Sequence, residues 1–125
     1  MVIVLDPSAS VDPFEQIRRQ IADGIRSGEL VGGQRLPSIR QLAGDLQVAA
    51  GTVAKAYAAL TAEGLIETNR TRGTRVVADQ ALAPSLHRAA RRYVSAAEGL
   101  DLEAALGAVR AAWAAAHGEV GPTDA

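Results

Sequence analysis

Cysteine is absent from the 125-residue chain, and aromatic side chains are few: one Trp, two Tyr and one Phe. Without cysteine the protein has no disulfide, no thiolate metal site and no thiol nucleophile. Its core must be built from Leu, Ile, Val and Ala, which supply most of the 48% apolar content. Length and composition therefore predict one small globular domain, or one domain with an extension.

A strong charge of either sign is also missing, because 13 Lys and Arg face 14 Asp and Glu, for a net charge of −1. Any affinity for nucleic acid must therefore come from a local patch and not from the field of the whole molecule. No long apolar run is present, since Val2 to Leu5 is too short for a signal peptide or a membrane span. We expect a cytoplasmic protein with no membrane partner.

Catalytic groupings are missing as well. His87 and His117 have no carboxylate at metal-ligand spacing and no nucleophile partner, which is typical of surface histidines on helices. Gly32-Gly33 lacks the Lys and the Ser or Thr of a phosphate-binding loop. The sequence predicts that the protein is not an enzyme and uses no metal or cofactor.

Residues 36–64 have the pattern of two short helices joined by a turn. Ser38 precedes an apolar run and Gln41 follows three residues later, a capping-box pattern that begins a helix. Residues 47–49 form the predicted turn, and Gly64 ends the second helix. Each helix has one apolar face, and these faces are expected to pack together. Their members are Ile39, Leu42 and Leu46 in the first helix, and Val53, Tyr57 and Leu60 in the second.

A two-stranded hairpin is predicted directly after these helices. Residues 65–67 and 74–77 alternate like strands, and residues 69–73 supply the turn, with Gly73 needing a positive φ. No acid lies between Glu67 and Asp79, so the hairpin is basic. Its arginines are Arg70, Arg72 and Arg75. The layout is that of a winged helix-turn-helix, whose second helix can enter the major groove of DNA. The alternative is a small helical motif with a solvated, charged turn.

The segment before residue 36 is predicted to form an arm and one helix. Residues 1–11 are an extended arm with a turn at residues 6–8, and Asp12, Pro13 and Glu15 form an N-terminal capping pattern. The predicted buried face of this helix consists of Phe14, Ile17, Ile21 and Ile25. Arg18 and Arg19 are interpreted as a solvated face, with phosphate contact as the alternative. Residues 34–36 are expected to form a short strand against the wing.

At this point the residues carry a family resemblance. The motifs are DPFEQIRRQIADGIRSGEL, then G-QRLPSIRQLAGDLQV, then TVAKAYAALTAEGLIE, then RGT. Residues 1–77 closely resemble the N-terminal DNA-binding domain of the GntR family of bacterial transcription regulators. The resemblance implies that Arg40, the start of the second helix and the tip of the wing contact DNA. With the basic wing included, the candidate DNA-contacting residues are Ser38, Arg40, Ala49, Ala50, Gly51, Thr52, Lys55, Arg70, Arg72, Gly73, Thr74 and Arg75.

One part of the chain departs from the family pattern. Many members have Ser or Asn, then Arg or Pro, then a polar residue, where this chain has Ala49-Ala50-Gly51. These small residues cannot form bidentate hydrogen bonds to bases, although they allow close backbone approach and Ala can touch a thymine methyl. Thr52 and Lys55 are the remaining polar candidates in this helix. Tyr57 is interpreted as a core residue.

Two further helices are predicted at residues 84–98 and 101–117, with Gly99 between them and Asp101 as a cap. Their apolar faces are too wide for two short helices to bury alone, so they need the winged domain, a second copy or both. With only 48 residues after Val77, the chain resembles the YtrA-like subfamily, whose two-helix extension serves dimerisation. The candidate dimer residues are Leu86, Tyr93, Leu102, Leu106, Val109 and Trp113.

These observations predict a mainly α fold with a small β-wing. Residues 1–77 would form a winged helix-turn-helix DNA-binding domain, residues 78–117 a helical dimerisation extension, and residues 118–125 a disordered tail. The predicted function is a homodimeric repressor that binds a pseudo-palindromic operator in double-stranded DNA. The rival is a winged-helix protein-interaction module without strong DNA contact. A small-molecule effector bound between the C-terminal helices can coexist with the repressor interpretation, although no residue pattern identifies a ligand.

Overall fold

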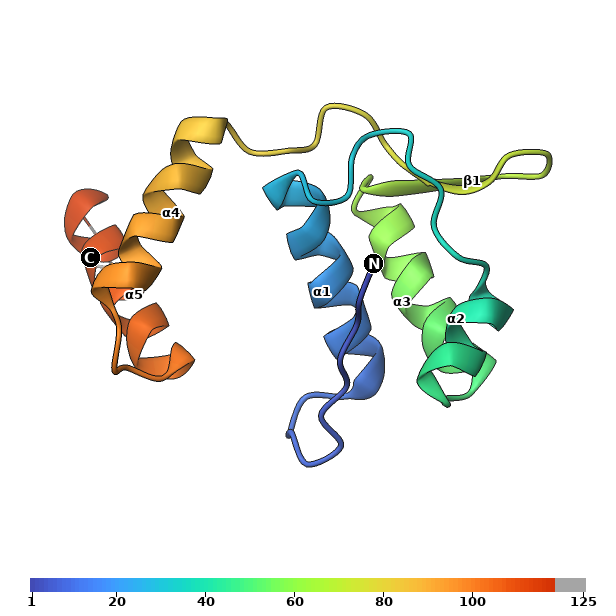
Figure 1. Ribbon diagram of the computed structural model, residues 1–125, viewed down its shortest axis with the longest axis horizontal. Helices are drawn as coiled ribbons and strands as arrows, with labels where there is room; N and C mark the ends of the chain where they lie inside the picture. The colour runs from blue at the N-terminus through green and yellow to red at the C-terminus, as the bar shows by residue number, and fades with distance from the viewer. Residues whose placement is uncertain (119–125) are drawn as a thin grey trace, which may run out of the picture. The chain divides into compact units, whose positions relative to one another are not determined.

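The computed structural model describes residues 1–118, and the predicted tail falls mostly outside them. The chain order is three helices, a two-stranded hairpin and two more helices (Figure 1). The elements are α1 (Pro13–Ser27), α2 (Ile39–Leu46), α3 (Ala50–Ala62), β1 (Ile66–Asn69), β2 (Gly73–Val76), α4 (Pro84–Ala96) and α5 (Leu102–Ala116). The chain divides into two compact units, the first from Met1 to Ala83 and the second starting at Pro84.

The core of the first unit lies where α1 and α2 pack against α3. In Figure 1, α1 and α3 run side by side and the hairpin extends from the end of α3. As predicted, the core is aliphatic, with one tyrosine among its buried members. These are Ile17, Ile21, Ala22, Ile25, Leu30, Leu36, Leu42, Ala43, Val53, Ala56, Tyr57, Leu60, Leu65, Ile66 and Val76. Burial of this surface stabilises the unit by roughly 25 cal/mol per Å² of apolar area removed from water.

Helix α1 begins at Pro13, whose fixed φ suits a first helical position, and ends at Gly28 in the left-handed conformation. The predicted side-chain cap is wrong, since the Asp12 side chain makes no cap hydrogen bond. The Glu15 carboxylate instead accepts hydrogen bonds from Arg18 at 2.7 Å. An ion pair one turn away thus replaces the capping contact.

Glutamine side chains of α1 hold the N-terminal arm. The Val4 N–H donates to Gln20 Oε1 at 3.0 Å, and Gln20 Nε2 donates back to the Val4 carbonyl at 2.8 Å. Gln16 forms the same reciprocal pair with the backbone of Asp6, at 2.8 and 3.1 Å. Each glutamine amide accepts a hydrogen bond from one backbone N–H and donates one to the C=O of the same residue. It therefore satisfies both backbone groups of that extended residue. The arm is therefore fixed along α1.

The helix-turn-helix forms as the sequence predicts, with one exception. Ser38 Oγ accepts the Gln41 N–H at 3.1 Å and caps α2. Gln47 takes the left-handed conformation at the turn, with φ of 58°. Leu42 is buried, but Ile39 is 37% exposed, so the prediction that Ile39 faces the core is wrong. Ile39 is the first residue of α2, and its side chain lines a groove that opens to the surface.

The wing is an antiparallel pair in which Ile66 faces Val76 and Asn69 faces Gly73. The turn is therefore shorter than predicted, and Asn69 Oδ1 organises it by accepting the N–H groups of Thr71 and Arg72. The predicted short strand before α2 is present as a bridge between Arg35 and Arg75. Its backbone bonds run from Leu36 N–H to the Thr74 carbonyl and from Val76 N–H to the Gln34 carbonyl.

The second unit is a helical hairpin. Gly99, with φ of 97°, allows the chain to reverse, and Asp101 Oδ1 caps α5 by accepting the Ala104 N–H at 2.8 Å. The Tyr93 hydroxyl donates to the Ala105 carbonyl at 2.7 Å and joins the two helices. Neither helix contains a buried residue. The apolar side chains that the sequence placed on one face are thus open to solvent.

Candidate nucleic-acid interface

A groove of about 340 Å³ lies between the start of α2, one face of α3 and the wing. Its lining combines hydroxyl and apolar side chains with one guanidinium. The residues are Arg35, Leu36, Ser38, Ile39, Ala54, Tyr57, Ala58, Thr61, Thr68, Gly73 and Thr74. Three of the predicted DNA-contacting residues, Ser38, Gly73 and Thr74, are brought together here from α2 and the wing.

The start of α2 presents Arg40 to solvent. Its side chain is exposed, and no carboxylate in residues 1–118 lies within ion-pair distance of it, Asp45 included. Ser38 caps the same helix end, where unpaired N–H groups and the helix dipole favour an anion. A cationic side chain at this end has the position and freedom to contact a phosphate or a base edge.

The first turn of α3 is built from small side chains. Ala49 occupies the N-cap position and forms no side-chain cap, so the first N–H groups of the helix lack a side-chain acceptor. Ala49, Ala50 and Gly51 are exposed, and Thr52 is half-buried. Space around Gly51 is open, because a Cβ there would meet nothing within 4 Å. This end of α3 permits close approach of a ligand backbone and offers few polar groups.

Lys55 is exposed, but its ammonium group has a neighbour. Lys55 Nζ lies 4.0 Å from the centroid of the Phe14 ring, a cation–π distance. Phe14 belongs to α1 and is only partly buried, so the predicted core role of this residue holds in part. The contact orients Lys55 toward the N-terminal end of α1.

The wing arginines divide into two kinds. Arg70 and Arg72 are exposed in the turn. Arg75 is half-buried, and its guanidinium donates to the Gly33 carbonyl at 2.9 Å and to the Arg72 carbonyl at 3.2 Å. Arg75 therefore braces the wing, whereas Arg70 and Arg72 extend from it. Gly73 has a φ of 76°, as its turn position required.

Eight of the eleven groove residues were absent from the predicted DNA-contacting set, among them Arg35 and Ile39. Arg35 lies in the short strand beside β2, and Ile39 is the first residue of α2. The signal for Arg35 was present, because the predicted strand at residues 34–36 placed it next to the basic wing. Periodicity places Ile39 on the core face of α2, but it does not reveal the groove that opens between α2, α3 and the wing.

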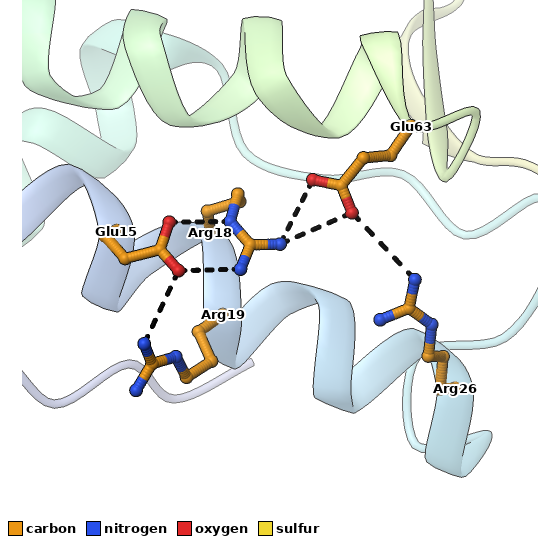
Figure 2. Close-up of polar contacts among 5 residues, drawn as sticks. All are labelled: Glu15, Arg18, Arg19, Arg26 and Glu63. Atoms are coloured by element: carbon orange, nitrogen blue, oxygen red, sulfur yellow. Dashed lines mark hydrogen bonds and ion pairs between the residues drawn. The ribbon is translucent and has the colours of Figure 1, made fainter. Parts of the chain in front are cut away.

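A chain of ion pairs fixes α1 to the far end of α3 (Figure 2). Arg18 pairs with Glu15 at 2.7 Å and with Glu63 at 3.0 Å, while Arg19 reaches Glu15 at 3.6 Å and Arg26 reaches Glu63 at 3.9 Å. Hydrogen bonds from Arg18 lower the pKa of Glu15, and the same contact raises the pKa of Arg18. Arg18 thus joins α1 to the end of α3, so its predicted solvated position is wrong. Arg19 is 57% exposed, as predicted, and pairs with Glu15 of its own helix. None of these five residues lines the groove.

Residues 13–76 match the model of the gntR family of bacterial regulatory proteins. The chain belongs to the GntR family. The HTH-type transcriptional regulator Rv1152 of Mycobacterium tuberculosis is 41% identical over 98 residues, which cover 78% of this chain and 81% of that protein. The HTH-type transcriptional repressor YtrA of Bacillus subtilis is 42% identical over 73 residues, 58% of this chain and 56% of that protein.

Among solved structures, YtrA from Sulfolobus acidocaldarius, a GntR-family transcription factor, matches with a TM-score of 0.59 at 34% identity. The match covers 77% of this chain and 99% of that one. A winged helix-turn-helix followed by two C-terminal helices, as in YtrA-like members of the family, is thereby confirmed. This GntR chain is a DNA-binding transcription regulator and not an enzyme. Among the described residues, no helix has the length and apolar character needed to cross a membrane.

Proposed function

We propose that this GntR regulator acts in the cytoplasm as a homodimeric repressor that binds a pseudo-palindromic operator, one half-site per subunit. The observation that carries the proposal is the combination of a winged domain with a basic, open face and a helical hairpin whose apolar side chains are exposed. A two-fold dimer imposes its symmetry on the DNA it binds. YtrA of Bacillus subtilis, which is named a repressor, supports the direction of regulation.

The DNA face comprises the start of α2, the first turn of α3 and the wing. Arg40, Arg70 and Arg72 are exposed there, so they are free to meet phosphate or base edges. The small residues at the start of α3 leave the backbone accessible but supply no bidentate base contact. Sequence preference therefore rests mainly on Arg40, Thr52 and the wing.

The dimer would form through the helical hairpin. Leu102 is 73% exposed, Trp113 is 65% exposed, and Leu86, Leu106 and Val109 are between 42% and 51% exposed. Apolar surface gathered on one element in this way marks a protein-interaction site. Tyr93 is half-buried, and its hydroxyl donates to the Ala105 carbonyl of the other helix. Tyr93 therefore joins the two helices and is less exposed than the other five residues.

The dimer is tested by sedimentation of the full-length protein and the double variant Leu102→Asp, Leu106→Asp. We expect wild type to sediment at twice the 13.0 kDa chain mass and the variant to dissociate, because two carboxylates in the interface would lose hydration. The matched control is Val31→Asp, which adds a carboxylate at a 58% exposed apolar position of the first unit. A variant that keeps the dimeric mass would exclude the hairpin as the interface.

DNA recognition is tested by selecting bound duplexes from a random library at defined salt and then titrating the Arg40→Ala variant. An enriched inverted repeat is expected for wild type. Arg40→Ala should fold normally and lose roughly 1–3 kcal/mol of affinity if Arg40 contacts a base, with preference relaxed at one position per half-site. A phosphate contact would weaken selected and scrambled duplexes equally. Wild-type affinity for both duplexes would remove Arg40 from the interface.

A further inference from the structure

We propose that Arg35 is a DNA-phosphate ligand and that the groove beside it receives the sugar–phosphate backbone between α3 and the wing. This assignment rests on the proposed DNA-binding function and adds a residue and an occupant to it. The occupant is one strand of duplex DNA, chosen because its anionic phosphates complement the single guanidinium in the groove.

The position of Arg35 is fixed by the sheet. Two backbone hydrogen bonds, one on each side of Arg35, attach its strand to β2. The Leu36 N–H donates to the Thr74 carbonyl at 2.8 Å, and the Val76 N–H donates to the Gln34 carbonyl at 2.9 Å. Its side chain crosses the wing at Gly73, where a Cβ would stand 3.2 Å from Arg35 Nε and 3.3 Å from Nη2. The glycine thus leaves the space that the guanidinium occupies.

Arg35 faces a second arginine in the sheet, while the cross-strand acid Glu67 of β1 stands opposite Arg75 and not opposite Arg35. Arg35 lies directly opposite Arg75 in the sheet, and like charges at such positions repel. Arg75 is held by two backbone carbonyls. In the part of the chain that the structure describes, no carboxylate is within 4.0 Å of the Arg35 guanidinium. An anion bound at Arg35 would offset the repulsion, and phosphate matches the planar fork of its donors.

The walls of the groove suit a nucleic-acid backbone. Ile39, Ala54 and Ala58 provide apolar surface for sugar carbons. The Thr68 and Thr74 hydroxyls hydrogen-bond each other at 3.2 Å, which leaves one hydroxyl proton to donate to a phosphate oxygen. Ser38 stands at the same groove at the start of α2. These groups position a backbone and carry no base information, so their loss should weaken binding to every sequence.

The test measures binding of the full-length chain by fluorescence anisotropy across a salt series. The probes are the duplex that wild type enriches and a scrambled duplex of equal length. Arg35→Gln should weaken binding to both about five- to tenfold at 0.1 M salt and make the slope of log affinity against log salt shallower by about 0.9. Arg35→Lys, which keeps the charge, should retain the wild-type slope. Arg26→Gln is the matched control, since Arg26 is 47% exposed on α1 and lies outside the groove.

The outcomes of these titrations decide whether Arg35 contacts phosphate. Equal slopes for wild type and Arg35→Gln, with wild type binding both duplexes, would overturn the Arg35 assignment and leave the proposed function intact. A loss confined to the enriched duplex with an unchanged slope would also overturn it, because that pattern reports a base contact. Wild type that enriches no duplex from the library and binds none in the titration would overturn the proposed function, and the assignment of Arg35 with it. Thermal melting of each variant excludes misfolding as the cause of lost affinity.

Discussion

Replacement of Tyr57 by Phe should separate the structural role of one hydroxyl from the role of its ring. Tyr57 is 4% exposed, and its hydroxyl donates at 2.7 Å to the carbonyl of Pro37, the residue before the α2 cap. Phe keeps the packed ring and leaves that carbonyl without its partner, at a cost of about 1–2 kcal/mol at neutral pH. For a unit of this size, 1 kcal/mol lowers the Tm by roughly 4–8 °C.

The same substitution should change the response to alkali. Burial raises the pKa of Tyr57 from 10.0 to about 12. A raised folded pKa gives stability that is complete below the unfolded value and is lost as pH rises through the folded value. Wild type should therefore lose about 2–3 kcal/mol between pH 10 and pH 12, since each pKa unit corresponds to 1.36 kcal/mol. The Phe variant has no group to ionise at this position. The difference in free energy of unfolding between wild type and the variant should therefore shrink as pH rises and then change sign.

Urea unfolding at pH 7, 10 and 11 measures both effects. Tyr93→Phe is the matched control, because Tyr93 also donates to a carbonyl at 2.7 Å but belongs to the second unit. It also leaves Tyr57 as the one tyrosine of the chain, so ultraviolet absorbance reports its ionisation directly. A stability difference between wild type and Tyr57→Phe that is the same at pH 7 and pH 11 would refute the reasoning.

Three further substitutions test other parts of the structure. Arg72→Ala should weaken DNA binding and make the salt slope shallower by about 0.9 if Arg72 neutralises one phosphate, whereas an unchanged slope would place it in solvent. Gly73→Ala should lower stability in thermal melts by about 1–2 kcal/mol, because its φ of 76° disfavours other residues; an unchanged Tm would contradict this. Glu15→Gln should remove less than about 1 kcal/mol at pH 7, since its ion pairs are partly exposed. Because Arg18 lowers the pKa of Glu15, that contribution is lost as pH falls below 4.5, so urea midpoints of the two proteins should converge in acid.

The order of the elements could be predicted from local patterns. Helical spacing, the Ser38 cap and the glycines at helix ends act over a few residues, so a single sequence displays them. The wing could be predicted because the sequence pattern changes from helical spacing to strand-like alternation, and because turn-forming residues precede Gly73. These signals also placed Leu42, Val53 and Leu60 in the core, where the structure has them.

The errors arose where a distant residue decides the outcome. Ile39 is exposed because it lines the groove formed by α2, α3 and the wing, an arrangement that the spacing within α2 does not report. The sequence pattern predicts that Glu15 caps α1, but its carboxylate pairs with the Arg18 guanidinium instead. The same guanidinium also pairs with Glu63 at the end of α3. The groove position of Arg35 depends on its pairing with β2. Such contacts join residues far apart in the chain, and periodicity does not report them.

The small, exposed side chains at the start of α3 leave room for larger residues. Because a Cβ at Gly51 would meet nothing within 4 Å, a larger residue there displaces no neighbour, and alanine has a higher helix propensity than glycine. The ion pairs at one end of α3 and the Tyr57–Pro37 bond hold the helix without using these side chains. On the DNA face proposed above, single substitutions at residues 49–51 would therefore change the groups offered to bases with little loss of folding stability, and they would require no compensating change in the core.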